Sequence, residues 1–188
     1  MLGTSAVAAA TGGPYQCELA VFRSVNDLPD AIHPPVWAVM QVGALGAGPV
    51  LGAVAWQAGY RDLATRMVAG ATASWALAKL VKRVVRRGRP AGLVPGTHVR
   101  GKEATGLGYL SGHSAVAVAL MTAMTSAAPH RRRLFGTAAA GVGLARMYVG
   151  AHLPLDVVGG AGLGLVVDSV VRRYLHNDER AATSEARR

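Results

Sequence analysis

The chain has 188 residues, of which 51% are hydrophobic and only 16% are charged, against about 25% charged in an ordinary soluble domain. This composition excludes a disordered or fibrous protein, and the length allows one domain, or at most five or six membrane helices of about 20 residues each. Lys and Arg outnumber Asp and Glu by 20 to 10, which gives a formal net charge of +10. The basic residues lie in clusters between apolar runs, as in the loops of membrane proteins, so the net charge does not by itself indicate a nucleic-acid partner.

Residues 1–35 precede the first long apolar run. Residues 1–13 are small and apolar but lack the basic start of a signal peptide, so the first membrane helix is expected to direct insertion. Within residues 15–33, apolar side chains recur at three-residue spacing, and polar ones, among them Glu18 and Asn26, lie between them. This pattern predicts an amphipathic helix along the membrane surface, with its polar residues outward. The single cysteine, Cys17, excludes an intramolecular disulfide framework and a Cys-based zinc cluster.

Five apolar runs follow this segment. The first, residues 36–60, has no Asp, Glu, Lys or Arg over 25 residues, more than the roughly 20 that cross a membrane, and Pro49 is expected to kink it. The other four runs cover residues 63–85, 111–128, 134–151 and 153–175. The sequence therefore predicts an all-α integral membrane bundle of five, or at most six, transmembrane helices over residues 36–176, followed by a polar tail over residues 177–188.

Counting membrane crossings assigns the connecting segments to two faces. The loop over residues 82–108 and the turn around His152 share one face, whereas the turn over residues 59–62, the basic loop over residues 131–133 and the C-terminal tail share the other. Both faces carry similar numbers of Lys and Arg, so the positive-inside rule does not orient the protein by itself. If the arginines of the first face bind a ligand, the second face is cytoplasmic.

Three polar patches on the first face carry the candidate chemistry. In the first patch, Lys82 and Arg89 are seven residues apart, about two helical turns, and are expected to point to the same side of one helix end. Arg offers a planar fork to two phosphoryl oxygens, and Lys adds a compact point charge. A basic cluster that merely flanks a membrane helix is the alternative interpretation.

The second patch, Ser111-Gly112-His113, opens an apolar helix. The free backbone N–H groups and the positive end of the helix dipole predict an anion site there. The imidazole of His113 stands at the edge of this site and can protonate a leaving oxygen near neutral pH. An ordinary Ser cap followed by an interfacial His is the alternative.

In the third patch, His152 and Asp156 lie four residues apart across Pro154, a residue type favoured in a first helical turn. The carboxylate can then hold one ring N–H and leave the other nitrogen as a nucleophile. Arg146, at the end of the preceding helix, is expected to return to the same level as a further phosphate ligand. A structural His–Asp pair beside a buried Arg is the alternative, although ionisable groups inside membrane helices are functional candidates by default.

Together the three patches resemble the signature of the type 2 phosphatidic acid phosphatase superfamily, which reads Lys-x6-Arg-Pro, Pro-Ser-Gly-His and Ser-Arg-x5-His-x3-Asp. In this chain the three parts are Lys82 to Pro90, Leu110 to His113 and Ala145 to Asp156. Leu110 stands where the family has Pro, and Ala145 stands where it has Ser. The second departure removes a hydroxyl that would contact a phosphate oxygen, a hydrogen bond worth about 1 kcal/mol or more.

The resemblance implies a helical, metal-independent phosphomonoester or diphosphate hydrolase that uses no cofactor. His152 would attack phosphorus to form a phosphohistidine, Asp156 would orient it, and His113 would protonate the leaving group and then activate water. The equatorial oxygens would be stabilised by the other five matched positions, Lys82, Arg89, Ser111, Gly112 and Arg146. This division of roles suits phosphoryl transfer, in which positioning and charge stabilisation dominate catalysis.

These observations predict a lipid phosphatase of the bacterial plasma membrane, with its active site on the extracytoplasmic face. A polyprenyl phosphate, diphosphate or phosphosugar of cell-wall synthesis is the favoured substrate, and phosphatidic acid or phosphatidylglycerol phosphate is the close alternative. A non-catalytic lipid-phosphate-binding protein is a further alternative, for which Ala145 is the best argument. A soluble vanadate-dependent haloperoxidase is disfavoured because residues 36–60 need lipid, and the chain lacks the aromatic-basic surface of a nucleic-acid binder. The expected partners are the phosphorylated lipid and the bilayer, and a homo-oligomer is left open.

Overall fold

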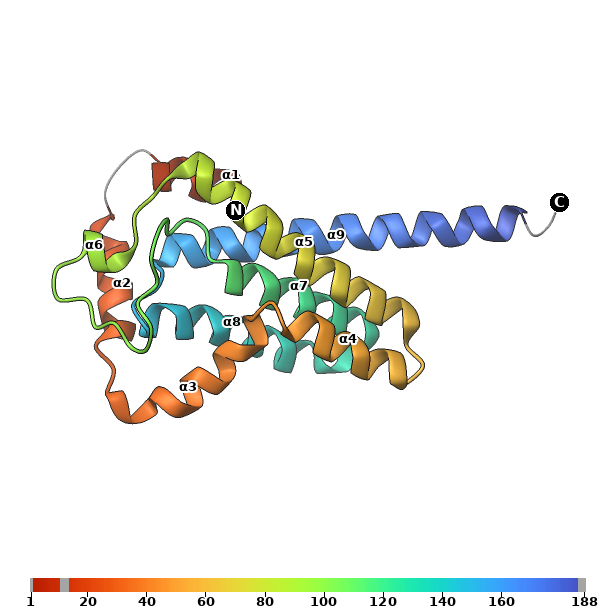
Figure 1. Cartoon of the computed structure of the whole chain (residues 1–188), viewed down its shortest axis with the longest axis horizontal. Coiled ribbons are helices and arrows are strands. Elements are labelled where there is room, and N and C mark those ends of the chain that lie inside the picture. Colours follow the sequence, from red (N-terminus) through yellow and green to blue (C-terminus); the bar gives the residue numbers. More distant parts are fainter. Residues whose placement is uncertain (1, 11–13, 186–188) are drawn as a thin grey trace.

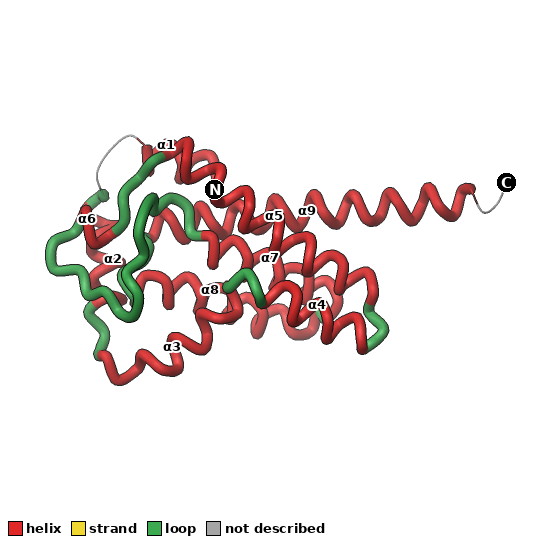
Figure 2. The backbone as a smooth tube through the Cα atoms, viewed as in Figure 1, coloured by secondary structure: helices red, strands yellow, loops and turns green. Residues whose placement is uncertain are grey.

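The computed structural model describes residues 2–10 and 14–185, and within this part of the chain all regular structure is helical, without strands (Figures 1 and 2). The α-helices of this part are α1 (Leu2–Ala10), α2 (Gln16–Asn26), α3 (His33–Met40), α4 (Ala47–Gln57), α5 (Arg61–Val85), α6 (Pro90–Leu93), α7 (Gly112–Ala127), α8 (Arg132–Tyr148) and α9 (Pro154–Glu185). Short 3₁₀-helices cover Asp30–Ile32, Gln41–Gly43 and Pro129–Arg131. The predicted all-α fold is confirmed.

The helix α7 forms the centre of the bundle and packs against α5, α8 and α9. Its buried side chains are mostly small or branched and include Ala115, Val116, Ala119 and Leu120. Gly164 of α9 lies against the α7 backbone, where a Cβ atom would collide with the carbonyl oxygen of Ala115. Small residues thus let the two helices approach closely, as is common between membrane helices.

The apolar run over residues 36–60 is not one helix. The helix α3 ends at Met40, the 3₁₀ turn follows, and α4 begins at Ala47 at an angle of 70° to the preceding segment. Pro49 lies in the first turn of α4, where its missing N–H interrupts no helical hydrogen bond. The prediction of one continuous helix with a kink at Pro49 was therefore wrong, because the helix breaks before Pro49, between Gly43 and Ala47.

The packing of the bend gives a physical reason for this break. At Gly43, the last residue of the 3₁₀ turn, an added Cβ atom would lie 2.5 Å from the backbone oxygen of His113 and 2.6 Å from a methyl group of Val142. The bend therefore fits against the starts and sides of two core helices at a point where no side chain can be accommodated. Apolar composition is compatible with this bent pair as well as with a straight span.

The later helices begin close to their predicted starts, and all but α9 also end close to their predicted ends, but not all of them meet the length and composition expected of a membrane span. In the described part of the chain, one helical stretch, Pro154–Asn177, is long and apolar enough to cross a membrane, and Asp30–Gly43 with Ala47–Gln57 qualifies only as a bent pair. The helices α7 and α8 have 16 and 17 residues, fewer than the roughly 20 of a typical span. The predicted count of five or six transmembrane helices is not confirmed.

The two ends of the described chain add to what the sequence predicted for residues 15–33 and for the tail. The helix α2 contacts α8 and α9, and it buries Glu18, Phe22 and Asn26, although periodicity placed Glu18 and Asn26 among the polar, outward residues. The helix α9 continues through the predicted start of the tail to Glu185 and projects beyond the other helices (Figure 1). At the opposite end of the bundle, α2, α6 and the loop between α6 and α7 lie together (Figure 2).

Candidate active site

The first patch is built by the end of α5 and the chain that leaves it. The helix ends at Val85, and Arg86 has a φ of 52°, in the left-handed region that commonly terminates helices. Lys82 lies in the last turn and donates from Nζ to the carbonyl oxygens of Leu107 at 3.2 Å and Gly108 at 2.9 Å. The expectation that Lys82 and Arg89 share one helix end was wrong, because Arg89 lies beyond the helix.

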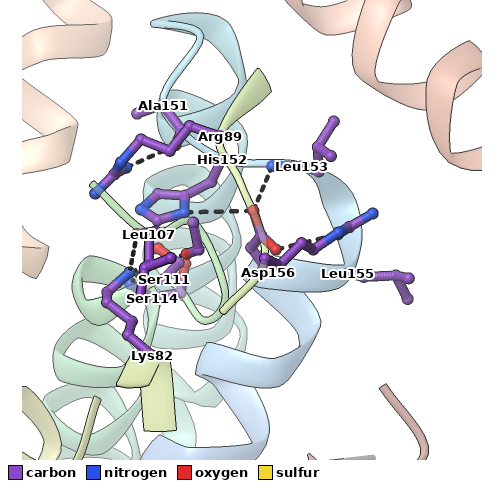
Figure 3. Close-up of polar contacts among 12 residues, drawn as sticks. Lys82, Arg89, Leu107, Ser111, Ser114, Ala151, His152, Leu153, Leu155 and Asp156 are labelled. Carbon is purple, nitrogen blue, oxygen red and sulfur yellow. Dashed lines mark hydrogen bonds and ion pairs between the residues drawn. The ribbon is translucent and has the colours of Figure 1, made fainter. Parts of the chain in front are cut away.

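Arg89 nevertheless reaches the same site from its extended segment. Its Nε donates to the carbonyl oxygen of Thr105 at 3.0 Å, and its Nη1 donates to that of Ala151 at 2.9 Å. Figure 3 shows Lys82 and Arg89 on two sides of the His152 ring. Both cations thus lie around the imidazole and donate to backbone carbonyl oxygens. These carbonyls are neutral, so an anionic ligand can replace them as hydrogen-bond partners.

The second patch forms the start of α7, as predicted. Ser111 is the N-cap of the helix, and its hydroxyl oxygen accepts from the backbone N–H of Ser114 at 3.3 Å and from the Ser114 hydroxyl at 3.0 Å. Gly112 opens the helix and His113 follows it. The charges of Arg146, Lys82 and Arg89 all act on the His113 imidazole, so the second patch lies within reach of the cations of the other two.

The third patch folds back over the end of α8. The backbone N–H groups of Ala151 and His152 both donate to the carbonyl oxygen of Arg146, at 3.1 and 3.2 Å. The guanidinium of Arg146 lies 2.9 Å from the sulfur of Met40 through Nη1, while its Nε is buried without a hydrogen-bond partner. An unpartnered buried N–H is costly, so this Nε is a donor available to a ligand.

His152 and Asp156 face each other, as predicted from their spacing. His152 Nδ1 lies 3.5 Å from Asp156 Oδ2, and the same oxygen accepts from the backbone N–H of Leu153 at 2.9 Å. Pro154 is the first residue of α9, so the carboxylate projects from the first helical turn. Because Nδ1 faces the carboxylate, the lone pair of a neutral imidazole resides on Nε2, on the opposite side of the ring.

The surroundings keep this imidazole neutral. Burial lowers the pKa of His152 well below its ordinary value, because a charged ring in a buried site loses its hydration. The neighbouring negative charge of Asp156 opposes this lowering of the pKa, but the positive charges of Lys82 and Arg146 add to it. A neutral, oriented imidazole with a free lone pair is the state that a nucleophile requires.

Two buried residues of the site were not predicted. Arg87, from the basic cluster of the first patch, lies between the carboxylates of Asp156 and Glu18. Burial alone lowers the pKa of the guanidinium, but the hydrogen bonds and charges of Glu18 and Asp156 outweigh it, and the pKa of Arg87 is raised. Nothing in the sequence pairs Arg87 with Glu18, which lies 69 positions earlier on a helix that periodicity assigned to the membrane surface.

The predicted site residues thus come together at one end of the bundle, from five separate parts of the chain. A family model described as the PAP2 superfamily matches residues 63–180. The chain belongs to the PAP2 superfamily. This is the type 2 phosphatidic acid phosphatase superfamily that the three patches resemble. All three patches and Arg87 lie inside the range that matches the PAP2 superfamily, whereas Glu18 lies outside it.

Two crystal structures share the fold of this PAP2 chain. LpxE of Aquifex aeolicus matches with a TM-score of 0.76 and 20% sequence identity, over 85% of this chain and 97% of its own. A transmembrane PAP2 type phosphatidylglycerolphosphate phosphatase of Bacillus subtilis matches with a TM-score of 0.74 and 20% identity, over 94% of this chain and 92% of its own. A search of curated proteins finds no significant match. The PAP2 fold therefore extends over nearly the whole chain.

Proposed function

We propose that this PAP2 protein hydrolyses the phosphate or diphosphate headgroup of a membrane lipid through a phosphohistidine on His152. The observation that carries this proposal is the pairing of a buried, neutral imidazole with Asp156 beside the cations Lys82 and Arg89. In the first step, His152 Nε2 forms a bond to phosphorus as the bond from phosphorus to the leaving oxygen breaks, and His113 gives that oxygen a proton.

In the second step, His113 takes a proton from water, and the oxygen of that water displaces the imidazole from phosphorus. Inorganic phosphate leaves, and His152 is restored to its starting state. The transferring oxygens are stabilised by the charges and donors of the three patches, namely Lys82, Arg89, Arg146, the Ser111 hydroxyl and the Gly112 N–H. These residues supply the charge and positioning that phosphoryl transfer needs, so the proposed reaction proceeds without a metal ion or cofactor.

A lipid substrate is supported by the surface of the bundle. Large apolar side chains are exposed along the sides of α4, α5, α8 and α9, among them Val50, Val54, Leu77, Leu80, Leu134, Leu144, Val166 and Val170. Exposed apolar surface of this extent is characteristic of contact with lipid. We place the membrane phosphatase unit over residues 36–176, between the N-terminal segment 1–35 and the tail 177–188, with the site on the extracytoplasmic face of a bacterial plasma membrane.

For the headgroup, the leading candidate is a polyprenyl phosphate or diphosphate, or a polyprenyl phosphosugar, of cell-wall synthesis. The second candidate is phosphatidylglycerol phosphate, with phosphatidic acid as its relative, because one structural neighbour is a phosphatidylglycerolphosphate phosphatase. Both kinds of substrate present a terminal phosphate on an apolar anchor, so a cationic site at one end of an apolar bundle suits either. A substrate panel distinguishes them.

The deciding experiment measures phosphate release by the detergent-purified protein from polyprenyl diphosphate, polyprenyl monophosphate, phosphatidylglycerol phosphate and phosphatidic acid, with excess EDTA. His152→Ala tests the nucleophile, and His98→Ala is the matched control, because the His98 side chain is 59% exposed in a loop. EDTA-resistant release that is lost in H152A and kept in H98A supports the proposal, and the order of rates ranks the lipids. Binding of vanadate without release from any lipid indicates a lipid-phosphate-binding protein instead.

A further inference from the structure

The buried carboxylate of Glu18 lies behind the candidate active site and is joined to it through Arg87. Arg87 Nη2 donates to Glu18 Oε2 at 2.6 Å, and Nη1 donates to Glu18 Oε1 at 2.9 Å and to Asp156 Oδ1 at 3.1 Å. The exposed fractions of the three side chains are 3% for Glu18, 3% for Arg87 and 0% for Asp156. Each of the two N–H groups on Nη1 therefore serves a different carboxylate.

Glu18 also contacts the helix that carries Asp156. Its Oε1 accepts from the backbone N–H of Leu155 at 3.0 Å, and Asp156 Oδ2 accepts from that of Leu153 at 2.9 Å. These N–H groups lie at the start of α9, where helical donors have no partner within the helix and a negative charge is favourable. One carboxylate from α2 thus binds both the guanidinium and the helix terminus that frame Asp156.

The two carboxylate oxygens of Asp156 consequently have different partners. Oδ1 is occupied by Arg87, whereas Oδ2 faces His152 Nδ1. Glu18 takes one N–H from each Nη group of Arg87, and Asp156 takes the second N–H of Nη1. Without Glu18, the planar fork of Arg87 is free to take both oxygens of Asp156, because bidentate pairing is the preferred geometry of Arg with a carboxylate. That rearrangement turns Oδ2 away from the imidazole.

From this geometry we infer that Glu18 and Arg87 are a pair of positioning residues for the proposed reaction. The helix α2 therefore contributes a residue, Glu18, to the active site. Both residues act through Asp156, by fixing the carboxylate in the rotation that holds His152. The inference rests on the proposed phosphohistidine function. It assigns a role to Glu18, which precedes the range matched by the family model, as well as to Arg87, which lies inside it.

The test compares Glu18→Gln and Arg87→Lys with a matched control elsewhere in the bundle. Arg66 and Asp168 form a second buried bidentate pair, with both N–O distances 2.7 Å. Asp168 lies on α9 about 18 Å from Asp156 at 1.5 Å per residue. Asp168→Asn therefore breaks a similar ion pair without contact with the site.

For E18Q and R87K we expect kcat to fall by about 10- to 100-fold, by analogy with the losses found when outer-shell residues that orient metal ligands are replaced. KM and the inhibition constant of vanadate should stay within about threefold, because neither residue is placed to touch the phosphate. In an Asp156→Asn background, E18Q should lower the residual kcat no further, which is the non-additivity expected of residues that act through one partner. D168N should leave kcat unchanged in both backgrounds.

Thermal melting of each variant in detergent identifies any that do not fold. If R87K does not fold, the kcat of E18Q alone tests the inference. A folded E18Q with wild-type kcat overturns the inference, and so does an equal fall in kcat in the wild-type and D156N backgrounds. A fall in kcat for D168N that matches the fall for E18Q also overturns it, because the effect is then one of general stability. Absence of release by the wild type overturns the proposed function, and the positioning role with it.

Discussion

The backbone N–H of Ser111 donates to the backbone carbonyl of Asp156 at 2.8 Å. This single bond joins the N-cap of α7 to the first turn of α9, and both residues are fully buried. The helix start that carries His113 is thereby held in fixed register with the turn that carries His152. The backbone segments that carry the proposed acid and the proposed nucleophile are thus joined directly by a buried hydrogen bond.

The proposed role of His113 as a general acid predicts how its removal depends on the leaving group. His113→Ala should lower kcat for a lipid monophosphate by about 100-fold or more, the usual contribution of a positioned general acid. The loss should be much smaller in the first step with p-nitrophenyl phosphate, since nitrophenolate leaves without a proton. Rapid-quench measurement of nitrophenol release in a single turnover checks this, beside the lipid assay. Equal losses with both substrates would contradict the role of His113 as an acid.

The buried imidazole predicts a stability difference below the ordinary pKa of histidine. Because the pKa of His152 is lowered on folding, the unfolded chain binds a proton below about pH 6.5 that the folded chain excludes. The free energy of unfolding therefore falls with decreasing pH, by up to about 1.4 kcal/mol per pH unit from this group. His152→Asn keeps an N–H toward Asp156 but does not titrate.

The thermal midpoints of detergent-solubilised wild type and H152N, measured from about pH 7.5 down to pH 4.5, give the comparison. The wild type should lose stability relative to H152N as the pH falls through this range. Parallel curves for the two proteins would show that His152 binds a proton equally well in the folded and unfolded chains.

Sequence predicted those parts of the site that depend on local spacing. His152 and Asp156 are four residues apart and meet in the structure, and Ser111 caps the helix that it was expected to cap. Spacing failed for Lys82 and Arg89, because a count of helical turns does not reveal that α5 ends at Val85. Arg89 still lies in the site, where the carbonyl oxygens of Thr105 and Ala151 hold its side chain.

The contacts that sequence could not predict join distant parts of the chain. Periodicity identifies the apolar side of α2 but treats every charged residue on it as solvated, so Glu18 was assigned to the surface. Its burial depends on Arg87, a partner that only the folded chain brings near. The bend between α3 and α4 also depends on contacts between distant residues, because Gly43 packs against His113 and Val142. The sequence pattern of residues 36–60 alone could not predict it.

The planar guanidinium of Arg89 predicts that replacement by lysine weakens the binding of a phosphate-like ligand. Arg89 now donates through Nε and Nη1 to two separate carbonyls, and the same donors can serve two oxygens of a bound phosphate. Arg89→Lys keeps the charge but loses the fork. Vanadate inhibition should weaken by about tenfold or more, as expected for loss of a charge-assisted hydrogen bond. Arg83→Lys, at an exposed position of the same basic cluster, should leave inhibition unchanged, and an equal effect of both changes would indicate a diffuse electrostatic contribution.

The second buried ion pair predicts a stability effect that is separate from catalysis. Arg66 and Asp168 have side-chain exposures of 10% and 4%, so Arg66→Met leaves a buried carboxylate without its partner. This should lower the free energy of unfolding by about 3–5 kcal/mol. Asp168→Asn should also destabilise the protein, but the double variant should recover part of the loss, since it contains neither unpaired charge. Denaturant titration in detergent measures all three variants beside the wild type. If the two losses simply add, the residues do not interact, and the bidentate pair between α5 and α9 contributes nothing to stability.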